Sequence, residues 1–358
     1  MTHVGPEQLT AQDLEQLTTA PLLYPFQFDW AGERALVLKV DDSFYKNAAF
    51  LDQRAGISQL PGAWMSLADL RQRLSGAPPR PLGFIFHIGH CGSTLLSRAI
   101  GLLENFFSLR EPLPLRDLAN FWAERDAPWS PLSETELYEM FDLMRVLWGR
   151  TPGADQRAIV KATSFCSSVA PVWLKRYPTD KALLLAMAPE KYIATMLGAP
   201  AYLLDIKGSA RTRMLSLMES TGSRTPALHS MSPGQLAAMS YFASLLPMEL
   251  ATHATGQAMR IDFDEYLADP LSELLRISAH LGFAVENASL VAALNSPVLA
   301  RYSKATEFKF SEADRAQRLD SSRQLNRREI RAGLDWIDDF STRHALAETA
   351  LANFGYQI

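Results

Sequence analysis

Apolar residues in this chain occur in short runs, and each run is followed by a longer segment with helical periodicity. The clearest runs are at 84–88, 157–165 and 181–187. Short apolar strands that alternate with helices are typical of a parallel sheet covered by helices on both faces. The pattern therefore predicts an α/β fold for most of the chain.

Helix signals support this alternation. Ser133 and Glu136 form a capping box at the start of one predicted helix, and Pro189 stands in the first turn of another. Pro247 lies inside a long apolar helix and should break or bend it. Residues 258–283 read as a strand followed by helices. We find no internal repeat that would suggest a solenoid.

The first 80 residues have a different pattern. Residues 26–40 predict two short strands around a Gly-Glu-Arg turn, and 41–56 predict one helix from an Asp start to a Gly stop. A second helix is expected within 65–76, before the chain breaks at the Pro-rich stretch 77–81. The predicted division is a small α+β accessory region over 1–80 and the main α/β domain over 81–358.

Composition narrows the class of protein. The chain has 358 residues, of which 47% are hydrophobic and 21% charged, as is usual for a globular protein in water. Its net charge of −4 argues against a nucleic-acid partner. Residues 301–331 carry nine Arg or Lys against five Asp or Glu, which indicates a nearby anionic ligand or only a solvated face.

Cysteine content and targeting signals bear on the compartment. Two cysteines, Cys91 and Cys166, provide no disulfide framework and no zinc spacing. The N-terminus lacks the basic and apolar regions of a signal peptide, and no apolar run approaches the roughly 20 residues that span a bilayer. We therefore expect a cytoplasmic protein without a membrane partner, whose oligomeric state the sequence leaves open.

The stretch 81–101, PLGFIFHIGHCGSTLLSRAIG, carries the most specific chemistry. Strand, tight glycine turn and helix form the shape of a phosphate-binding loop. In the G-x-x-x-x-G-K-[ST] frame, His87 replaces the first glycine, Gly92 keeps the second, Ser93 replaces the lysine, and Thr94 keeps the hydroxyl. Amides around Gly92 and the positive end of the helix still suit a phosphate, whereas ATP or GTP hydrolysis is disfavoured. The alternative is a turn that binds nothing.

Within this stretch, HCGSTLL resembles the loop of sulfotransferases, roughly Arg/Lys-Ser-Gly-Thr-Thr-Leu-Leu. Three later segments strengthen the resemblance, which covers about residues 80 to 340. MAPEKYIATML, at 187–197, is similar to the family's 3′-phosphate element: Pro189 and Thr195 keep its spacing, but Met187 stands at the Arg position. Residues 260–283 and the tail from 301 to 319 resemble the family's late strand-and-helix segment and its C-terminal closing segment.

The resemblance implies a P-loop-type parallel sheet flanked by helices and a sulfuryl transfer from 3′-phosphoadenosine 5′-phosphosulfate (PAPS) to a small-molecule hydroxyl acceptor, with 3′-phosphoadenosine 5′-phosphate (PAP) as product. No metal is required. The implied donor-binding residues of the loop are Gly89, His90, Cys91, Gly92, Ser93, Thr94 and Leu95. Cys91 is expected to be a simple replacement for serine, although a reactive thiolate at a helix N-terminus is a second reading.

Three residues are candidates for catalysis. Glu111, after the second strand, resembles a glutamate that acts as acceptor base in some bacterial members; its neighbour Arg110 would hold it ionised or grip the acceptor. Lys161 lies in an apolar strand, where its ammonium is expected to reach the site as a donor. His90, when protonated, would replace the loop's Arg or Lys, or would point away as a neutral imidazole. Surface roles for Glu111 and Lys161 are the alternatives.

The 3′-phosphate needs a substitute for the missing arginine. The candidates are Arg211 or Arg213, of which at most one should point into a given pocket, and Arg301 or Lys304 in the tail. Tyr302 is expected to stack on adenine or to pack the tail down.

Two other functions remain open. One is a non-catalytic binding protein that keeps the fold, because His90 and Met187 depart from the donor-site pattern. The other is a P-loop kinase-like nucleotide-binding protein, against which Ser93 in the lysine position argues.

Overall fold

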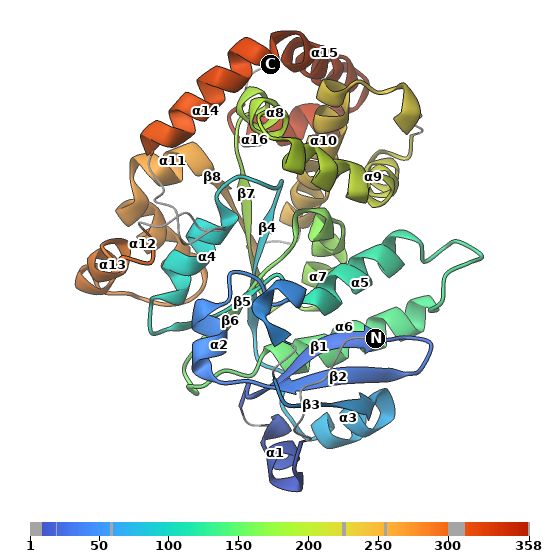
Figure 1. Cartoon of the computed structure of the whole chain (residues 1–358), viewed down its shortest axis with the longest axis vertical. Helices are drawn as coiled ribbons and strands as arrows, with labels where there is room; N and C mark the ends of the chain where they lie inside the picture. The colour runs from blue at the N-terminus through green and yellow to red at the C-terminus, as the bar shows by residue number, and fades with distance from the viewer. Residues whose placement is uncertain are drawn as a thin grey trace.

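The computed structural model describes residues 9–18, 20–57, 60–223, 227–253, 256–299 and 312–356. Its centre is a five-stranded parallel sheet with the strand order β5-β6-β4-β7-β8 (Figure 1). The predicted α/β fold is therefore confirmed. The strands are β4 (Leu82–His87), β5 (Phe106–Arg110), β6 (Arg157–Lys161), β7 (Lys181–Ala186) and β8 (Ala258–Asp262).

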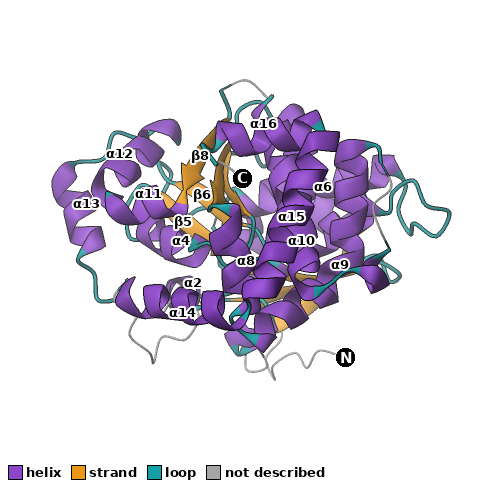
Figure 2. Ribbon diagram, turned by 90° about the horizontal axis from the view of Figure 1, so that it is seen from above, coloured by secondary structure: helices purple, strands orange, loops and turns teal. Residues whose placement is uncertain are grey.

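Helices cover both faces of this sheet, as the view in Figure 2 shows. On one side lie α4 (Ser93–Gly101), α11 (Phe263–Ala268), α12 (Pro270–His280) and α13 (Asn287–Leu294). On the other side lie α9 (Pro200–Thr221), α10 (Pro233–Thr252), α15 (Arg327–Arg343) and α16 (Ala345–Asn353). Every residue of β4 is buried, as expected for a strand covered on both faces.

The N-terminal region forms a separate antiparallel sheet of three strands, β1 (Leu23–Asp29), β2 (Arg34–Lys39) and β3 (Gly62–Ser66). The β1–β2 hairpin was predicted; β3 was not. The predicted helix over 41–56 is too long, because α2 (Asp42–Asn47) ends early. The Asp52 carboxylate accepts a hydrogen bond from the Arg54 amide and caps a separate 3₁₀ turn, so the segment does not form one continuous helix.

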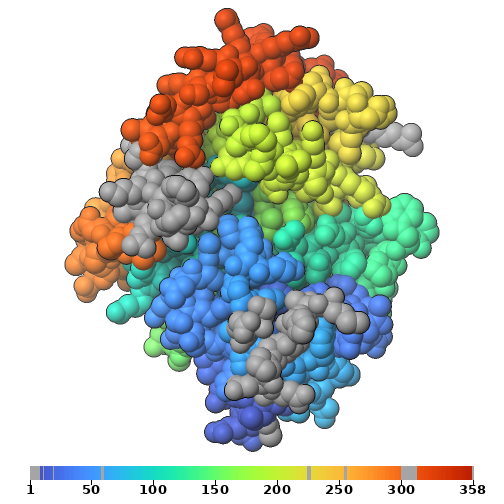
Figure 3. All heavy atoms as spheres, in the orientation of Figure 1, coloured from blue at the N-terminus to red at the C-terminus, as the bar shows by residue number. Residues whose placement is uncertain are grey.

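Two buried arginines tie the N-terminal region to the main sheet. The Arg150 guanidinium donates to the Leu17 and Leu23 carbonyls, each at 2.7 Å. Arg110 donates through Nε to the Ala48 carbonyl at 2.8 Å. In Figure 3 the blue atoms of this region adjoin the following segments without a break. The division at residue 80 stays a prediction about domains, but side chains beyond it anchor the backbone before it.

The helix signals of the sequence have mixed outcomes. The Ser133–Glu136 capping box is present, and Pro189 opens its helix as predicted. Helix α10 continues through Pro247 without a break. None of the described helices is long and apolar enough to cross a membrane. The remaining helices are α1 (Ala11–Glu15), α3 (Leu67–Leu74), α5 (Leu113–Ala123), α6 (Glu134–Trp148), α7 (Ala170–Arg176), α8 (Pro189–Leu197) and α14 (Glu312–Leu325).

Candidate active site at the carboxyl edge of the sheet

The parallel sheet brings the predicted site residues to one edge. The loop 88–92 follows β4, Glu111 follows β5, and Lys161 is the last residue of β6. Strand β4 is central, with β6 on one side and β7 on the other. In open α/β sheets, ligands bind outside the carboxyl ends of the strands where the strand order reverses direction. The loop therefore lies where this fold class places its ligands.

Left-handed backbone conformations shape the loop. Gly89, His90 and Gly92 have φ angles of 96°, 51° and 78°. Gly92 must be glycine for a second reason, because a Cβ there would lie 1.9 Å from Cε2 of Phe263 on α11. The Phe263 ring thus packs directly on the turn, and the glycine is needed there to let this ring lie close to the loop backbone.

His87, at the position of the first P-loop glycine, fixes the start of the turn. Its ring is buried; Nδ1 accepts a hydrogen bond from the Gly89 amide at 3.0 Å. Nε2 lies 2.9 Å from the Ala162 carbonyl. Because Nδ1 accepts, the proton belongs on Nε2, which donates to that carbonyl. His87 is therefore a neutral structural residue.

The loop leads into a helix start with unused donors. Ser93, Thr94 and Leu95 form the first turn of α4, and none of their amides donates to a backbone carbonyl among the described residues. The Thr94 side chain is 2% exposed, and its Oγ1 has no hydrogen-bond partner in the described part of the chain. A buried hydroxyl without a partner costs free energy, and beside free amides at a helix start this atom is suited to bind an oxygen of an anionic ligand.

Cys91 does not fit the thiolate reading. Its side chain is fully buried, and its Sγ lies 3.5 Å from the Leu185 carbonyl of β7. Burial raises the pKa of the Cys91 thiol to about 12. The thiol is a small packing residue beneath the loop, which supports its reading as a replacement for serine.

The side chain of His90 turns toward α9. Its ring centroid lies 3.9 Å from that of Tyr202, and its Nε2 lies 3.6 Å from an Asp205 carboxylate oxygen. This placement corresponds to the second of the two alternatives, an imidazole that points away. Its role as the loop's cation stays a prediction.

Glu111 and Lys161, predicted independently, meet at the strand ends. The register pairs Arg110 of β5 with Lys161 of β6, so Glu111 stands one residue beyond the pair. The Lys161 ammonium, with a side chain 1% exposed, donates to Glu111 Oε1. The Glu111 amide returns a 2.7 Å hydrogen bond to the Lys161 carbonyl. Glu111 holds a left-handed φ of 54°, a strained conformation of the kind found at functional sites.

The prediction that Arg110 would lie beside Glu111 was wrong. Arg110 points to the opposite side, where its guanidinium donates to the backbone carbonyls of Tyr45, Lys46 and Ala48. Successive side chains of a strand point to opposite faces, so neighbours in sequence do not share a site. Burial lowers the pKa of Arg110 to about 10. The second cation beside Glu111 is Arg54 instead, whose Nη2 lies 3.4 Å from Oε2.

A further titratable carboxyl group, that of Asp117, lies one turn into α5. Burial raises the pKa of Asp117 from 3.8 to about 6, and the charge of Arg116 opposes this shift without cancelling it. Asp117 was not singled out from the sequence, where it carries no signal beyond its position after Glu111.

The segment that resembles the 3′-phosphate element contains a cation that the sequence reading overlooked. Met187 is buried, and the Thr195 hydroxyl donates to the Lys191 carbonyl within α8. Lys191 itself extends from the first turn of α8, and its Nζ lies 2.8 Å from Asp264 Oδ2. Arg315 of α14 reaches the other oxygen of the same carboxylate at 2.8 Å.

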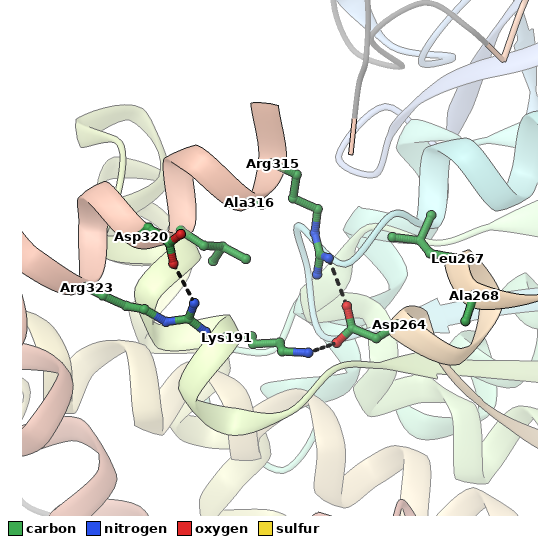
Figure 4. A pocket seen from close by; sticks show the side chains of 9 residues that line it. Lys191, Asp264, Leu267, Ala268, Arg315, Ala316, Asp320 and Arg323 are labelled. Atoms are coloured by element: carbon green, nitrogen blue, oxygen red, sulfur yellow. Dashed lines mark hydrogen bonds and ion pairs between the residues drawn. The ribbon is translucent and has the colours of Figure 1, made fainter. Parts of the chain in front are cut away.

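These three side chains border a cavity of about 310 Å³ between α8, α11 and α14 (Figure 4). Burial would raise the pKa of Asp264, but the hydrogen bond from Lys191 and the charge of Arg315 outweigh it and hold the pKa below its usual value. Arg315 also stacks on Phe263, with its guanidinium carbon 4.9 Å from the ring centroid. Its Nη2 is buried without a partner among the described residues. The cavity is thus linked to the phosphate loop through Phe263.

The other candidate residues for binding the 3′-phosphate lie in different surroundings. Arg211 is 65% exposed and pairs with Glu124 of the loop after α5, whereas Arg213 is buried. As expected for residues two apart, they face different directions. Arg301, Tyr302 and Lys304 lie outside the described residues. Among the residues that are described, no cluster of His, Cys, Asp or Glu is arranged to hold a metal ion.

Comparisons with known proteins point to similar architectures. No family model and no curated protein matches the chain. Among solved structures, the sulfotransferase domain of the curacin biosynthetic pathway is 14% identical over 78% of this chain and 99% of its own, with a TM-score of 0.41. A sulfotransferase from Alicyclobacillus acidocaldarius is 14% identical over 78% and 97%, with a TM-score of 0.37. Mouse sulfotransferase SULT7A1, solved with PAP, is 14% identical over 75% and 88%, with a TM-score of 0.41.

All three of these structures are sulfotransferases. Identities of 14% and TM-scores near 0.4 are too low to carry a functional argument. The case for function therefore rests on the geometry of the loop, the Glu111–Lys161 pair and the cavity.

Proposed function

We propose that this chain is a sulfotransferase that moves a sulfuryl group from PAPS to the hydroxyl group of a small molecule in the cytoplasm. The observation that carries the proposal is the meeting, at one sheet edge, of two features. One is the helix start with an unpartnered buried Thr94 hydroxyl, and the other is the buried Lys161–Glu111 pair. A phosphate loop supplies the donor end, and a carboxylate on the adjacent strands supplies the acceptor end.

At the donor end, the chain offers neutral donors instead of a lysine. The amides of Ser93, Thr94 and Leu95 and the Thr94 hydroxyl would bind the 5′-phosphosulfate, helped by the positive end of α4. When bound, PAPS would supply an activated sulfuryl group. The donor set fits it, because oriented amides and hydroxyls stabilise a phosphate without a metal ion.

At the acceptor end, Glu111 would take the proton of the acceptor hydroxyl as that oxygen becomes a nucleophile. Lys161 donates to Glu111 and would orient the carboxylate. Lys161 is also the last residue of β6, the strand that pairs with β4. A role for its ammonium as a donor to the bridging oxygen of PAPS or to the acceptor therefore stays part of the proposal. The acceptor is thus expected between the β5 and β4 strand ends.

For the 3′-phosphate we propose Lys191 and Arg315 in place of the arginine missing at Met187. Both are cations beside one cavity, and the Nη2 group of Arg315 is a buried donor without a partner in the described residues. Charge-assisted hydrogen bonds of this kind contribute about 1.5–3 kcal/mol each. Thr195, with its hydroxyl bound inside α8, would shape this end rather than supply its charge.

The proposal is tested by titrating the protein with PAP, ADP and ATP, each with and without magnesium. We expect PAP to raise the melting temperature most, and magnesium to make no difference. A transfer assay with PAPS and a panel of phenols and alcohols, read by mass spectrometry, then tests chemistry. A magnesium-dependent ATP response would favour the kinase-like alternative. No response to any nucleotide would favour a binding protein that has kept only the fold.

A further inference from the structure

The segment between α2 and β3 belongs to the N-terminal region, yet it reaches the candidate catalytic carboxylate. Arg54 Nη2 lies 3.4 Å from Glu111 Oε2, and the Arg54 guanidinium carbon lies 3.6 Å from the ring centroid of Phe50. The Lys161 ammonium lies 5.6 Å from the same ring. Phe50 therefore lies beside both cations that flank Glu111. The N-terminal region supplies one wall of the site.

This wall is held in place by hydrogen bonds from both sides. The Leu51 amide donates to the Arg110 carbonyl at 2.7 Å, directly before Glu111. The Tyr24 hydroxyl of β1 donates to the Leu51 carbonyl at 3.0 Å. Arg110 binds the backbone at Ala48 through its side chain. The position of Arg54 relative to Glu111 is thus fixed by the fold.

Two arginines at this wall share one buried carboxylate. The Asp52 side chain is 3% exposed; Arg54 binds it through Nε and Nη2, and Arg116 of α5 approaches it at 3.9 Å. The side chains of Arg54 and Arg116 are 55% and 37% exposed. The Asp52 carboxylate thus accepts hydrogen bonds from Arg54 and attracts Arg116 only through its charge.

Both guanidiniums have N–H donors that form no hydrogen bond among the described residues. Arg54 Nη1 has no hydrogen-bond partner among the described residues, and Arg116 donates no hydrogen bond to any of them. Guanidinium donors fixed in one plane match the two oxygens of a carboxylate. The neighbouring carboxyl group on α5, Asp117, is partly buried, and no hydrogen bond joins it to Arg116 among the described residues.

We infer that the acceptor is a hydroxylated carboxylic acid, whose carboxylate binds Arg54 and Arg116 while its hydroxyl faces Glu111. This inference rests on the proposed sulfuryl transfer for its chemistry, but not for its binding geometry. The segment 48–56 of the N-terminal region then selects the acceptor, and the parallel sheet carries the donor loop.

The test measures binding and does not depend on turnover. Calorimetric titrations of the full-length protein saturated with PAP use 3- and 4-hydroxybenzoate and the corresponding neutral hydroxybenzamides. We expect at least one acid to bind on the order of tenfold more tightly than its amide, the factor that one modest charge-assisted contact provides. The variants Arg54→Gln and Arg116→Gln should each reduce this ratio and leave PAP affinity unchanged.

A matched control is Arg276→Gln, which removes an exposed guanidinium whose one ion pair among the described residues is with Glu273 on α12. This variant should keep the acid-to-amide ratio of the wild type. Arg116→Gln breaks no hydrogen bond in the described residues, so it remains informative if Arg54→Gln does not fold.

Equal binding of acid and amide, binding of neither, or a preference that survives both arginine substitutions would overturn the inference. Failure of PAP to bind would instead count against the proposed donor. In that case the same acid and amide titrations without PAP still decide whether the two arginines form a carboxylate site.

Discussion

Removing the unpartnered hydroxyl of Thr94 should have two opposite effects: the protein should become more stable, and its affinity for the donor nucleotide should fall. Valine has nearly the same shape as threonine but replaces the hydroxyl by a methyl group. In the ligand-free protein, the Thr94 hydroxyl is shielded from water and lacks a partner among the described residues. Such a group costs about 1–3 kcal/mol. Thr94→Val should therefore raise the free energy of unfolding by about 1 kcal/mol or more, or the melting temperature by about 2 °C.

The same substitution should weaken donor binding. If the hydroxyl donates to a phosphate oxygen of the nucleotide, its loss removes a charge-assisted bond of about 1.5–3 kcal/mol. The dissociation constant for PAP should then rise by roughly 10- to 150-fold. Chemical denaturation without ligand and calorimetric titration with PAP measure the two effects on the same protein samples.

Ser278 provides the matched control. It is buried on α12, outside the loop, and its hydroxyl also lacks a partner among the described residues. Ser278→Ala should leave PAP affinity unchanged. A Thr94→Val protein that is more stable but binds PAP like the wild type would show that the loop is only a turn. A Thr94→Val protein that is less stable would mean that water satisfies the hydroxyl, and the reasoning about a missing ligand would fail.

Three further substitutions test the loop, the base and a buried carboxyl. Glu111→Gln should lower the transfer rate by about 10²–10⁴-fold and keep PAP affinity, as single-turnover kinetics and calorimetry would measure. Gly92→Ala places a Cβ 1.9 Å from the Phe263 ring at a positive φ, so it should lower the free energy of unfolding in urea by about 2–5 kcal/mol. Gly222→Ala, at a positive φ with open space around it, should lower it by about 1 kcal/mol. Burial raises the pKa of Asp117 to about 6, so the folded state binds the carboxyl proton more tightly than the unfolded state does. The contribution of Asp117 to the free energy of unfolding therefore falls as pH rises from 4 to 6. Asp117→Asn should remove that slope and raise stability at pH 8 by up to about 3 kcal/mol, and an unchanged pH profile would refute the assignment.

Local patterns in the sequence predicted the strands of the main sheet and most capped helices, because each depends on a few neighbouring residues. Helix α9 was not identified, and its buried positions explain why. Ile206, Ala210, Arg213 and Leu217 follow a helical period, but an arginine stands in the buried stripe. Two of its hydrogen-bond partners, Ser244 and Ser164, come from distant segments, so the sequence gives no sign that this arginine is buried.

The candidate site was predicted residue by residue but not as a set of contacts. Glu111 and Lys161 were each identified, yet their pairing follows from the register of β5 and β6, which the sequence does not specify. Lys191 and Arg315 were missed because each looks like an ordinary surface cation in its own helix. Only Asp264, on a third helix, brings them together. A signal was available, since Lys191 stands inside the segment that resembles the 3′-phosphate element.

Arg213 connects these observations to the loop. This residue is 2% exposed, and its guanidinium donates to the hydroxyls of Ser209, Ser244 and Ser164, with no carboxylate partner among the described residues. Ser164 in turn packs on Gly89, where an added Cβ would lie 3.2 Å from its side chain. A buried cation is costly unless a negative charge compensates it. The described residues offer Arg213 only neutral oxygens. We therefore expect an anion bound at the loop to compensate this charge, in which case Arg213 would do the work of the lysine that the loop lacks.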